Sequence, residues 1–289
     1  MSRHHAGAQA APALTDLRMA ADYQPVAQAL AQHWPDVKLE VCDSLDSTNS
    51  ELMRRARAGQ VQPTLLVARQ QTAGRGRLGR QWLSGSGLTD ANANANANGE
   101  GASLTFSLGL PLAPASWSGL SLAVGVSIAA GLHPELRLKW PNDLWLHERK
   151  LGGILIETAA LDGGRQAIVG VGINLGARGD TGLARTPAWL EELLPGIDAP
   201  QALLRIAGPL LEAIRNFELR GFAPFQPGFA QRDALMGAPL TLSDGTCGIG
   251  QGVNAEGALL LRTADGLQAI TGSEVSLRLA PAPQSGTHT

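Results

Sequence analysis

The stretch QQTAGRGRLGRQW, residues 70–82, decides between competing folds for this chain. It holds three glycines and three arginines in the seven positions from Gly74 to Arg80. The glycine spacing G-x-G-x-x-G is typical of a dinucleotide-binding turn, in which the last glycine opens a helix and an acidic residue follows about 20 positions later. Here Gly79 is followed by Arg80, Gln81 and Trp82 and then by a polar low-complexity run. The context therefore excludes a Rossmann fold.

Two other functions for this loop also fit poorly. A P-loop requires a Gly-Lys dipeptide, and the chain contains none. A nucleic-acid arm would depend on three arginines without a wider basic surface, which would give weak binding. Glycines let backbone N–H groups approach an anion closely, and arginines donate paired hydrogen bonds to it. We expect residues 70–82 to enclose a phosphate or carboxylate; an exposed glycine-rich linker is the alternative.

Composition limits the class of protein. The chain has 289 residues, of which 44% are hydrophobic, enough for a sizeable core and two domains. A net charge of −2 argues against a protein that coats nucleic acid or an anionic membrane. Cys42 and Cys247 are far apart, outside the patterns of zinc sites and disulfide frameworks. With no signal peptide and no membrane-length apolar run, we expect a soluble cytoplasmic protein with reduced thiols.

Hydrophobic periodicity predicts a mixed α/β region followed by a small all-β region. We expect helices over residues 21–34, 46–59, 118–132 and 201–221, with Ser47 or Thr48 as the cap of the second one. We expect strands over residues 38–45, 63–70, 103–110 and several segments of 136–176. Residues 235–279 contain Asp-Gly, Glu-Gly and Asp-Gly turns between short strands, which is the chemistry of hairpins. Residues 1–20 and the low-complexity run after Trp82 are predicted to be loose.

Five segments together resemble the bacterial biotin–protein ligases of the single-function type. They are DSTN (46–49), QQTAGRGRLGRQW (70–82), KWPNDL (139–144), RKLGGILIE (149–157) and GVGINL (170–175). The resemblance implies an α+β fold, with a catalytic domain like that of class II aminoacyl-tRNA synthetases, built on a mixed sheet and followed by an SH3-like barrel. The expected boundaries are a tail and helix at 1–38, the catalytic domain at 39–232, the barrel at 233–280 and a tail at 281–289.

The resemblance also implies a reaction in two steps. Biotin and ATP, with Mg²⁺, would form biotinyl-5′-adenylate and pyrophosphate, and a lysine of a biotin carboxyl carrier protein, usually that of acetyl-CoA carboxylase, would then take the biotinyl group. Adenylation brings two anions together, so cations and amide donors must offset their repulsion. The mixed anhydride must also be kept from water until the acceptor arrives. No residue pattern assigns ligands to the Mg²⁺.

The matched motifs assign roles residue by residue. By similarity, biotin binding falls to Ser47, Thr48, Asn49, Gln71, Arg75, Gly76, Arg77, Lys150 and Gly153. Hydroxyl and amide groups suit the ureido ring of biotin, which presents one carbonyl acceptor and two N–H donors. For Ser47, Thr48 and Asn49 a plain helix cap is the alternative, and both roles can hold at once.

The nucleotide site is assigned in the same way. ATP or adenylate binding falls to Gly74, Arg77, Arg80, Trp82, Asn142, Lys150 and Asn174, and the catalytic residues are Lys150, Arg77 and Asp143. Lys150 is expected to contact both the biotin carboxylate and the α-phosphate. Asp143 would position metal, phosphate or the incoming lysine, with an Asx-turn as its alternative. Trp82 either stacks on adenine or only packs the base of the loop.

Departures from the family pattern define the rival functions. Only 45 residues precede Asp46, with no basic recognition helix, so a DNA-binding role is not expected. GLTDANANANAN, within residues 85–102, reads as an insertion beside the loop. A lipoate or octanoate ligase or transferase is the enzymatic rival, a non-catalytic biotin- or nucleotide-binding regulator is another, and an interaction module a third. Family members often dimerise through sheet edges, so a homodimer is possible on this resemblance.

Overall fold

A computed structural model describes residues 21–84, 103–161, 163–177, 186–271 and 278–279. Its main layer is a seven-stranded sheet in the order β1-β2-β3-β7-β6-β5-β4. Strands β1 and β2 are parallel and every other neighbouring pair is antiparallel. The bounds are β1 Lys38–Leu45, β2 Thr64–Gln71, β3 Ser103–Pro111, β4 Arg137–Lys139, β5 Asp143–Leu146, β6 Arg149–Leu161 and β7 Gly164–Asn174.

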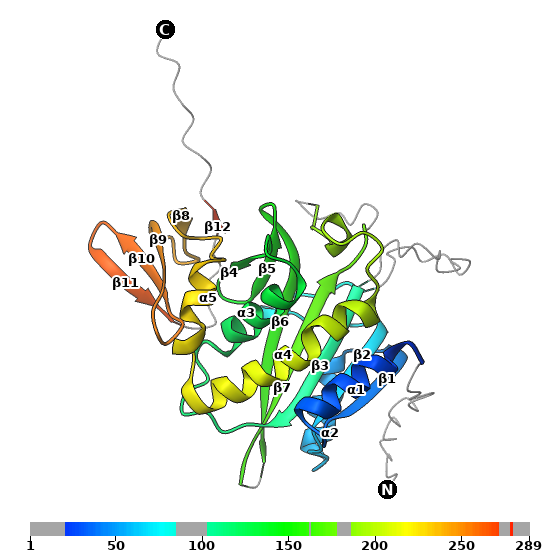
Figure 1. The fold of residues 1–289 in the computed structure, drawn as a ribbon. Coiled ribbons are helices and arrows are strands. Elements are labelled where there is room, and N and C mark those ends of the chain that lie inside the picture. Colours follow the sequence, from blue (N-terminus) through cyan, green and yellow to red (C-terminus); the bar gives the residue numbers. More distant parts are fainter. Residues whose placement is uncertain (1–20, 85–102, 162, 178–185, 272–277, 280–289) are drawn as a thin grey trace, which may run out of the picture.

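Helices cover both faces of this sheet, as Figure 1 shows for α1 and α4 on one of them. Leu65 and Val67 of β2 belong to the core that contains α1, α3 and α4, whereas Leu66 and Ala68 belong to a second core under α2. Successive side chains of a strand point to opposite faces, so a continuous apolar run marks a strand buried on both sides. The apolar segment TLLVA of β2 therefore accounts for the packing of helices on both faces of the sheet.

The predicted helices are confirmed. They are α1 Gln24–His33, α2 Thr48–Arg57, α3 Leu120–Leu132 and α4 Ala199–Arg220, with the short α5 Gln226–Ala230 after them; 3-10 turns occupy Ala21–Tyr23, Arg77–Gly79, Leu190–Glu192 and Ala223–Phe225. Helix α2 connects the parallel strands β1 and β2, and α1 packs on α4. Helix α3 is apolar nearly all round because it lies between α4 and the sheet.

A second, five-stranded antiparallel sheet follows, in the order β11-β10-β9-β8-β12. Its strands are β8 Pro239–Thr241, β9 Cys247–Val253, β10 Leu259–Thr263, β11 Gly266–Ile270 and β12 Arg278–Leu279. The three predicted turns are confirmed, since Gly245, Gly257 and Gly266 all have positive φ, a conformation that glycine adopts without steric cost. The Trp140 indole Nε1 donates to the Gly257 carbonyl at 3.0 Å, so this sheet is anchored beside the KWPNDL segment.

The predicted fold, a mixed α+β region followed by a small SH3-like β module, is confirmed. The domain boundaries stay predictions. The predictions for the tails at 1–20 and 281–289 and for the insertion at 85–102 concern residues outside those that the structure describes. Within the described ranges no helix is long and apolar enough to cross a membrane. Cys42 is buried, Cys247 is exposed, and both are free thiols.

Candidate active site

A cleft at the meeting point of α2, the 70–82 loop and strands β5–β7 gathers most of the predicted site residues. The predicted residues that line the cleft are Ser47, Thr48, Asn49, Gln71, Arg75, Gly76, Arg77, Arg80, Trp82, Asn142, Asp143, Lys150 and Gly153. Segments more than 100 positions apart in sequence, such as those of Ser47 and Gly153, thus face one another. The arrangement brings the five motif segments to one place, with the exceptions given below.

The N-terminus of α2 forms one wall of the cleft. Ser47 is the N-cap, and its hydroxyl accepts from the Ser50 amide at 3.4 Å. The Asp46 carboxylate accepts from the Ser47 amide at 2.8 Å. Ser47 and Thr48 are only 2% and 3% exposed, so the cap sits inside the protein, where its polar groups need partners. The predicted cap is therefore confirmed at Ser47, and Thr48 is the first helical residue.

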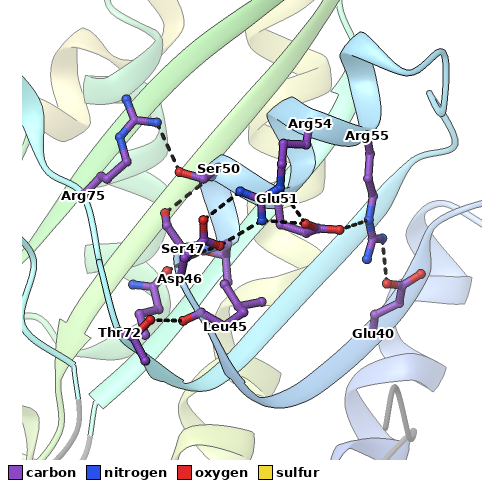
Figure 2. Close-up of polar contacts among 12 residues, drawn as sticks. Glu40, Leu45, Asp46, Ser47, Ser50, Glu51, Arg54, Arg55, Thr72 and Arg75 are labelled. Atoms are coloured by element: carbon purple, nitrogen blue, oxygen red, sulfur yellow. Dashed lines mark hydrogen bonds and ion pairs between the residues drawn. The ribbon is translucent and has the colours of Figure 1, made fainter. Parts of the chain in front are cut away.

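Ion pairs along α2 hold that turn in place (Figure 2). Arg54 pairs with Asp46 and with Glu51, both at 2.7 Å, and Arg55 pairs with Glu51 at 2.9 Å and Glu40 at 2.7 Å. The hydrogen bond from Arg54 holds the pKa of the Asp46 carboxyl below its ordinary value. Asp46 is therefore charged near neutral pH and remains an acceptor for the Ser47 amide.

A hydrogen-bond network fixes the polar end of the cleft. The Gln71 side-chain oxygen accepts from the Thr48 amide at 2.7 Å and from its hydroxyl at 3.1 Å. The Ser107 hydroxyl lies 2.7 Å from the Thr48 hydroxyl and 2.6 Å from Asn49 Oδ1. Ser107 is fully buried. This end of the cleft is a neutral polar pocket whose groups are already oriented.

The glycine–arginine loop turns back on itself instead of opening a helix. Arg75 and Gln81 form an antiparallel bridge, and the Gly76 amide donates to the Arg80 carbonyl at 2.7 Å. Between them lies the short 3-10 turn, in which Leu78 has φ 57° and is 61% exposed. The exclusion of a Rossmann turn is confirmed, because the glycines serve a tight hairpin.

Two arginines of this loop face opposite walls. The Arg75 guanidinium donates to the Glu157 carboxylate at 2.9 Å and to the Ser50 hydroxyl at 3.4 Å; Figure 2 shows it pointing to Ser50. Arg77 reaches across the cleft to Asn142 Oδ1 at 3.4 Å. Burial lowers the pKa of the Arg77 guanidinium, although arginine stays protonated in proteins. Among the described residues no carboxylate lies at contact distance from Arg77, and a half-buried cation of this kind is suited to an anionic ligand.

Lys150 and Asp143 occupy the opposite wall, on β6 and β5. Lys150 Nζ lies 2.6 Å from Asp143 Oδ1. A Cβ at Gly153 would lie 3.3 Å from that nitrogen, so glycine gives the lysine room along the strand. Asn142 Nδ2 donates to the Ile154 carbonyl at 2.7 Å, which turns Asn142 Oδ1 toward Arg77. Two cations therefore converge on the space between the loop and these strands.

The Trp82 indole packs directly on β7. A Cβ at Gly172 would collide with its ring, and its Nε1 is buried with no hydrogen-bond partner among the described residues. The packing role foreseen for Trp82 is present, and stacking on adenine stays a prediction.

Two residues predicted for the nucleotide site, Asn174 and Gly74, are not among those that line the cleft. The buried Asn174 side chain donates to the Ala188 carbonyl at 3.1 Å, so its amide is used to hold a neighbouring segment. Gly74 lies against the Trp82 carbonyl, where a Cβ would collide. The structure gives both residues a packing role, and their contact with nucleotide stays a prediction.

The sequence reasoning missed several residues of the wall. The cleft is also lined by Leu78, Gln81, Phe106, Lys139, Trp140, Pro141, Ile154, Leu155, Gly170, Val171 and Gly172. Lys139, Trp140 and the glycines of β7 stand inside the recognised motifs, which was a usable signal. For Ser107, which contacts two residues of the wall, the signal was weaker: it is one of three buried hydroxyl residues on β3, with Ser103 and Thr105, and buried polar groups need partners.

Comparisons with known proteins agree with this geometry. Residues 41–174 match the Biotin/lipoate A/B protein ligase family, and residues 240–278 match the Biotin protein ligase C terminal domain. The bifunctional ligase/repressor BirA of Escherichia coli is 33% identical over 247 residues, which are 82% of this chain and 73% of that protein. The biotin–[acetyl-CoA-carboxylase] ligase of Paracoccus denitrificans is 33% identical over 80% of this chain and 96% of its own length.

A solved structure supports the same relationship. The biotin protein ligase from Aquifex aeolicus in complex with biotin and ATP is 29% identical and superposes with a TM-score of 0.69. The superposition covers 84% of this chain and 99% of that one. Both regions of the fold are therefore shared with a protein whose structure holds the two ligands named.

Proposed function

This chain belongs to the biotin/lipoate A/B protein ligase family, and on that premise we propose that its cleft performs the two half-reactions of a biotin–protein ligase. In the first, an oxygen of the biotin carboxylate attacks the α-phosphorus of ATP, and pyrophosphate leaves. In the second, a lysine amine of a carrier protein attacks the acyl carbon of biotinyl-5′-adenylate, and AMP leaves. The enzyme is an ATP-dependent ligase with biotin and ATP as its substrates.

One observation carries the proposal: a neutral, hydrogen-bonding pocket opens directly onto a pair of cations. The pocket is formed by Ser47, Thr48 and Asn49, and the cations are Arg77 and Lys150. Biotin has the matching order of groups, since a neutral ureido ring lies at one end and a carboxylate at the other. Arginine and lysine beside that carboxylate offset its repulsion from the phosphates of ATP.

Lys150 is assigned the central catalytic role. Its Nζ lies 2.6 Å from Asp143, so the carboxylate holds the ammonium in the cleft before an anionic substrate arrives. A charge fixed in advance stabilises the negative charge that develops during transfer without further reorganisation. Arg77, from the loop, supplies the second cation and closes the site against water.

The donor set fits a Mg²⁺ that arrives with the nucleotide. Among the described residues, no group of three or more histidine, cysteine, aspartate or glutamate side chains is arranged to hold a metal. Mg²⁺ is commonly bound through one or two carboxylates together with substrate phosphates. Asp143, with Asn142 beside it, would supply the protein ligand, and the ion would neutralise part of the triphosphate charge.

The finer points of the assignment are also proposals. The carrier is the biotin carboxyl carrier protein of acetyl-CoA carboxylase, as the name of the Paracoccus relative suggests. Because the reaction consumes ATP, we place it in the cytoplasm. A homodimer formed through a sheet edge is consistent with β1, an outer strand of the seven-stranded sheet.

Pyrophosphate exchange into ATP by the purified protein tests the proposal, with biotin and lipoate in parallel reactions. Exchange that depends on biotin alone is the expected result. Exchange with lipoate instead would transfer the protein to the sister activity and reassign the polar pocket. If biotin binds and neither acid supports exchange, the cleft is that of a non-catalytic biotin-binding regulator, and Lys150 and Arg77 only hold the ligand.

A further inference from the structure

We propose that Glu157 is a positioning residue that couples the polar pocket to the arginine loop and is required for biotin binding. It stands on β6, the strand that also carries Lys150 and Gly153, and it does not line the cleft. Its two carboxylate oxygens contact one residue from each half of the site, Asn49 and Arg75. The inference rests on the proposed function, because it concerns how that site holds biotin.

The first contact fixes the orientation of the Asn49 amide. Nδ2 donates to Glu157 Oε2 at 2.9 Å and to the Leu155 carbonyl at 3.3 Å. Both partners only accept hydrogen bonds, so the nitrogen must occupy this position and the oxygen must point the other way. Asn49 Oδ1 then lies 2.6 Å from the Ser107 hydroxyl. This oxygen accepts from Ser107, and its second lone pair can accept another hydrogen bond, which suits an N–H of the ureido ring.

The second contact restrains the loop. Arg75 donates to Glu157 Oε1 at 2.9 Å and also to Ser50 on helix α2 at 3.4 Å. Glu157 is 21% exposed and Arg75 is 48% exposed, so the pair is shielded on the carboxylate side. Arg75 is the first residue of the bridge to Gln81 that closes the hairpin. One carboxylate thus sets the base of the loop relative to the residues that face the ligand.

Both partners of Glu157 are donors, and this makes the isosteric glutamine a sharp probe. A glutamine offers one acceptor oxygen, so either Asn49 Nδ2 or Arg75 would face an NH₂ group. The conflict is relieved if the Asn49 amide rotates, which turns a donor toward the ligand, or if Arg75 moves away. Either result weakens the fit to biotin, whereas the ATP-facing residues on β5 and β6 are not touched.

The experiment measures biotin-dependent pyrophosphate exchange in Glu157→Gln, with KM determined separately for biotin and for ATP. We expect KM for biotin to rise about tenfold or more, as for an unsatisfied buried donor, with KM for ATP within about twofold of wild type. Glu192→Gln is the matched control. Glu192 is 19% exposed and accepts from Arg149 and from the Trp189 amide, and none of these residues lines the cleft.

Two further backgrounds separate the contacts. If Glu157 acts through Arg75, Glu157→Gln raises KM for biotin by a smaller factor in the Arg75→Ala variant than in the wild-type protein. The same comparison in the Asn49→Ala variant measures the contact with Asn49. Glu157→Asp keeps both acceptors on a shorter stem, reaches one partner, and is expected to give an intermediate KM. It also provides a measurable protein should the glutamine variant fail to fold.

The outcomes distinguish this inference from the function on which it rests. An unchanged KM for biotin in both Glu157 variants, with exchange in wild type intact, overturns the role of Glu157 alone. Equal changes in KM for biotin and ATP, or an equal change in Glu192→Gln, would reduce Glu157 to a stabilising residue and also overturn it. Absence of biotin-dependent exchange in wild type overturns the proposed function and this inference together.

Discussion

The two halves of the cleft are built in opposite ways. In the polar pocket Ser47, Thr48 and Asn49 are 2–3% exposed, and a network from α2, β2, β3 and β6 holds their side chains. In the loop half, Leu78 is 61% exposed, and Arg77 crosses the cleft on a single 3.4 Å hydrogen bond to Asn142 among the bonds described. The polar half is fixed by its own hydrogen bonds, whereas the part of the loop that carries Arg77 and Leu78 is held by fewer contacts.

The physical reason lies in the cost of burial. A neutral polar group can be buried at little cost when every donor and acceptor has a partner. A buried cation without a counterion is far more expensive, so the half-buried Arg77 suits a site that closes only when an anion is present. We therefore expect the loop to tighten on ligand binding, which would also shield the mixed anhydride from water.

Removal of the Lys150 charge, which lies between the two halves of the cleft, should have the largest effect on activity. In Lys150→Met the ammonium that we propose to face both anions is lost, and kcat for pyrophosphate exchange is expected to fall by about 100- to 1000-fold. Lys150→Arg keeps the charge with a different geometry, and its kcat should lie between those of wild type and Lys150→Met. Steady-state exchange measures both. A methionine variant with near-normal kcat would show that the loop half alone supplies the electrostatics.

Two glycines of β7 allow the two halves of the cleft to be tested separately, because one glycine lies against each half. A Cβ at Gly170 would collide with the Asn49 amide, and a Cβ at Gly172 would collide with the Trp82 ring. We expect Gly170→Ala to raise KM for biotin by about tenfold and Gly172→Ala to act mainly on KM for ATP.

Gly164→Ala is the control for this pair, since it lies on the same strand with nothing within 4 Å of the added Cβ. Its kinetic constants should match those of wild type. If Gly170→Ala and Gly172→Ala change the same constant to the same extent, the two halves are not separable and the comparison fails.

Arg77→Gly tests closure of the loop half by itself. Because the variant lacks the cation that bridges to Asn142, activated biotin is expected to escape before transfer. The measurement is mass spectrometry of a reaction that contains the carrier protein and an unrelated lysine-rich protein. Biotin label on bystander lysines should increase roughly several-fold over wild type. Strictly carrier-specific labelling by the variant would show that Arg77 does not retain the intermediate.

The smallest effect is expected at Asp233, which belongs to neither half and lies just before the C-terminal sheet. Burial raises the pKa of its carboxyl from 3.8 to about 6, and its Oδ2 has no partner among the described residues. Between these values the unfolded chain releases the proton while the folded protein keeps it. The free energy of unfolding should therefore fall as pH rises from about 4 to about 6, by about 1–2 kcal/mol.

Asp233→Asn serves as the reference for this measurement, because its amide oxygen can still accept from the Leu235 amide and does not titrate. Denaturant titrations at several pH values give the free energy of unfolding of both proteins. The difference between wild type and variant isolates the contribution of the Asp233 carboxyl. A difference that is constant from pH 4 to 7 would contradict the raised pKa.

Much of the fold was predictable because local chemistry and tertiary structure agree. The cap at Ser47, the positive-φ glycines of the C-terminal turns and the two-sided apolar strand TLLVA each carry their reason within a few residues. The site was predictable where a motif keeps its functional groups close together, as in STN and in KLGG.

The rest depended on contacts between distant segments. Glu157 reads as the last residue of a motif, yet it joins Asn49, 108 positions earlier, to Arg75, 82 positions earlier. Asn174 stands in a recognised motif, yet its amide is taken by Ala188. Sequence by itself determined the elements, the family and the kinds of group in the cleft, since these follow from local patterns. Only the tertiary structure decided which hydrogen bonds those groups make with one another, because a donor hydrogen used within the protein is no longer offered to a ligand, whereas an oxygen with a second lone pair still can accept.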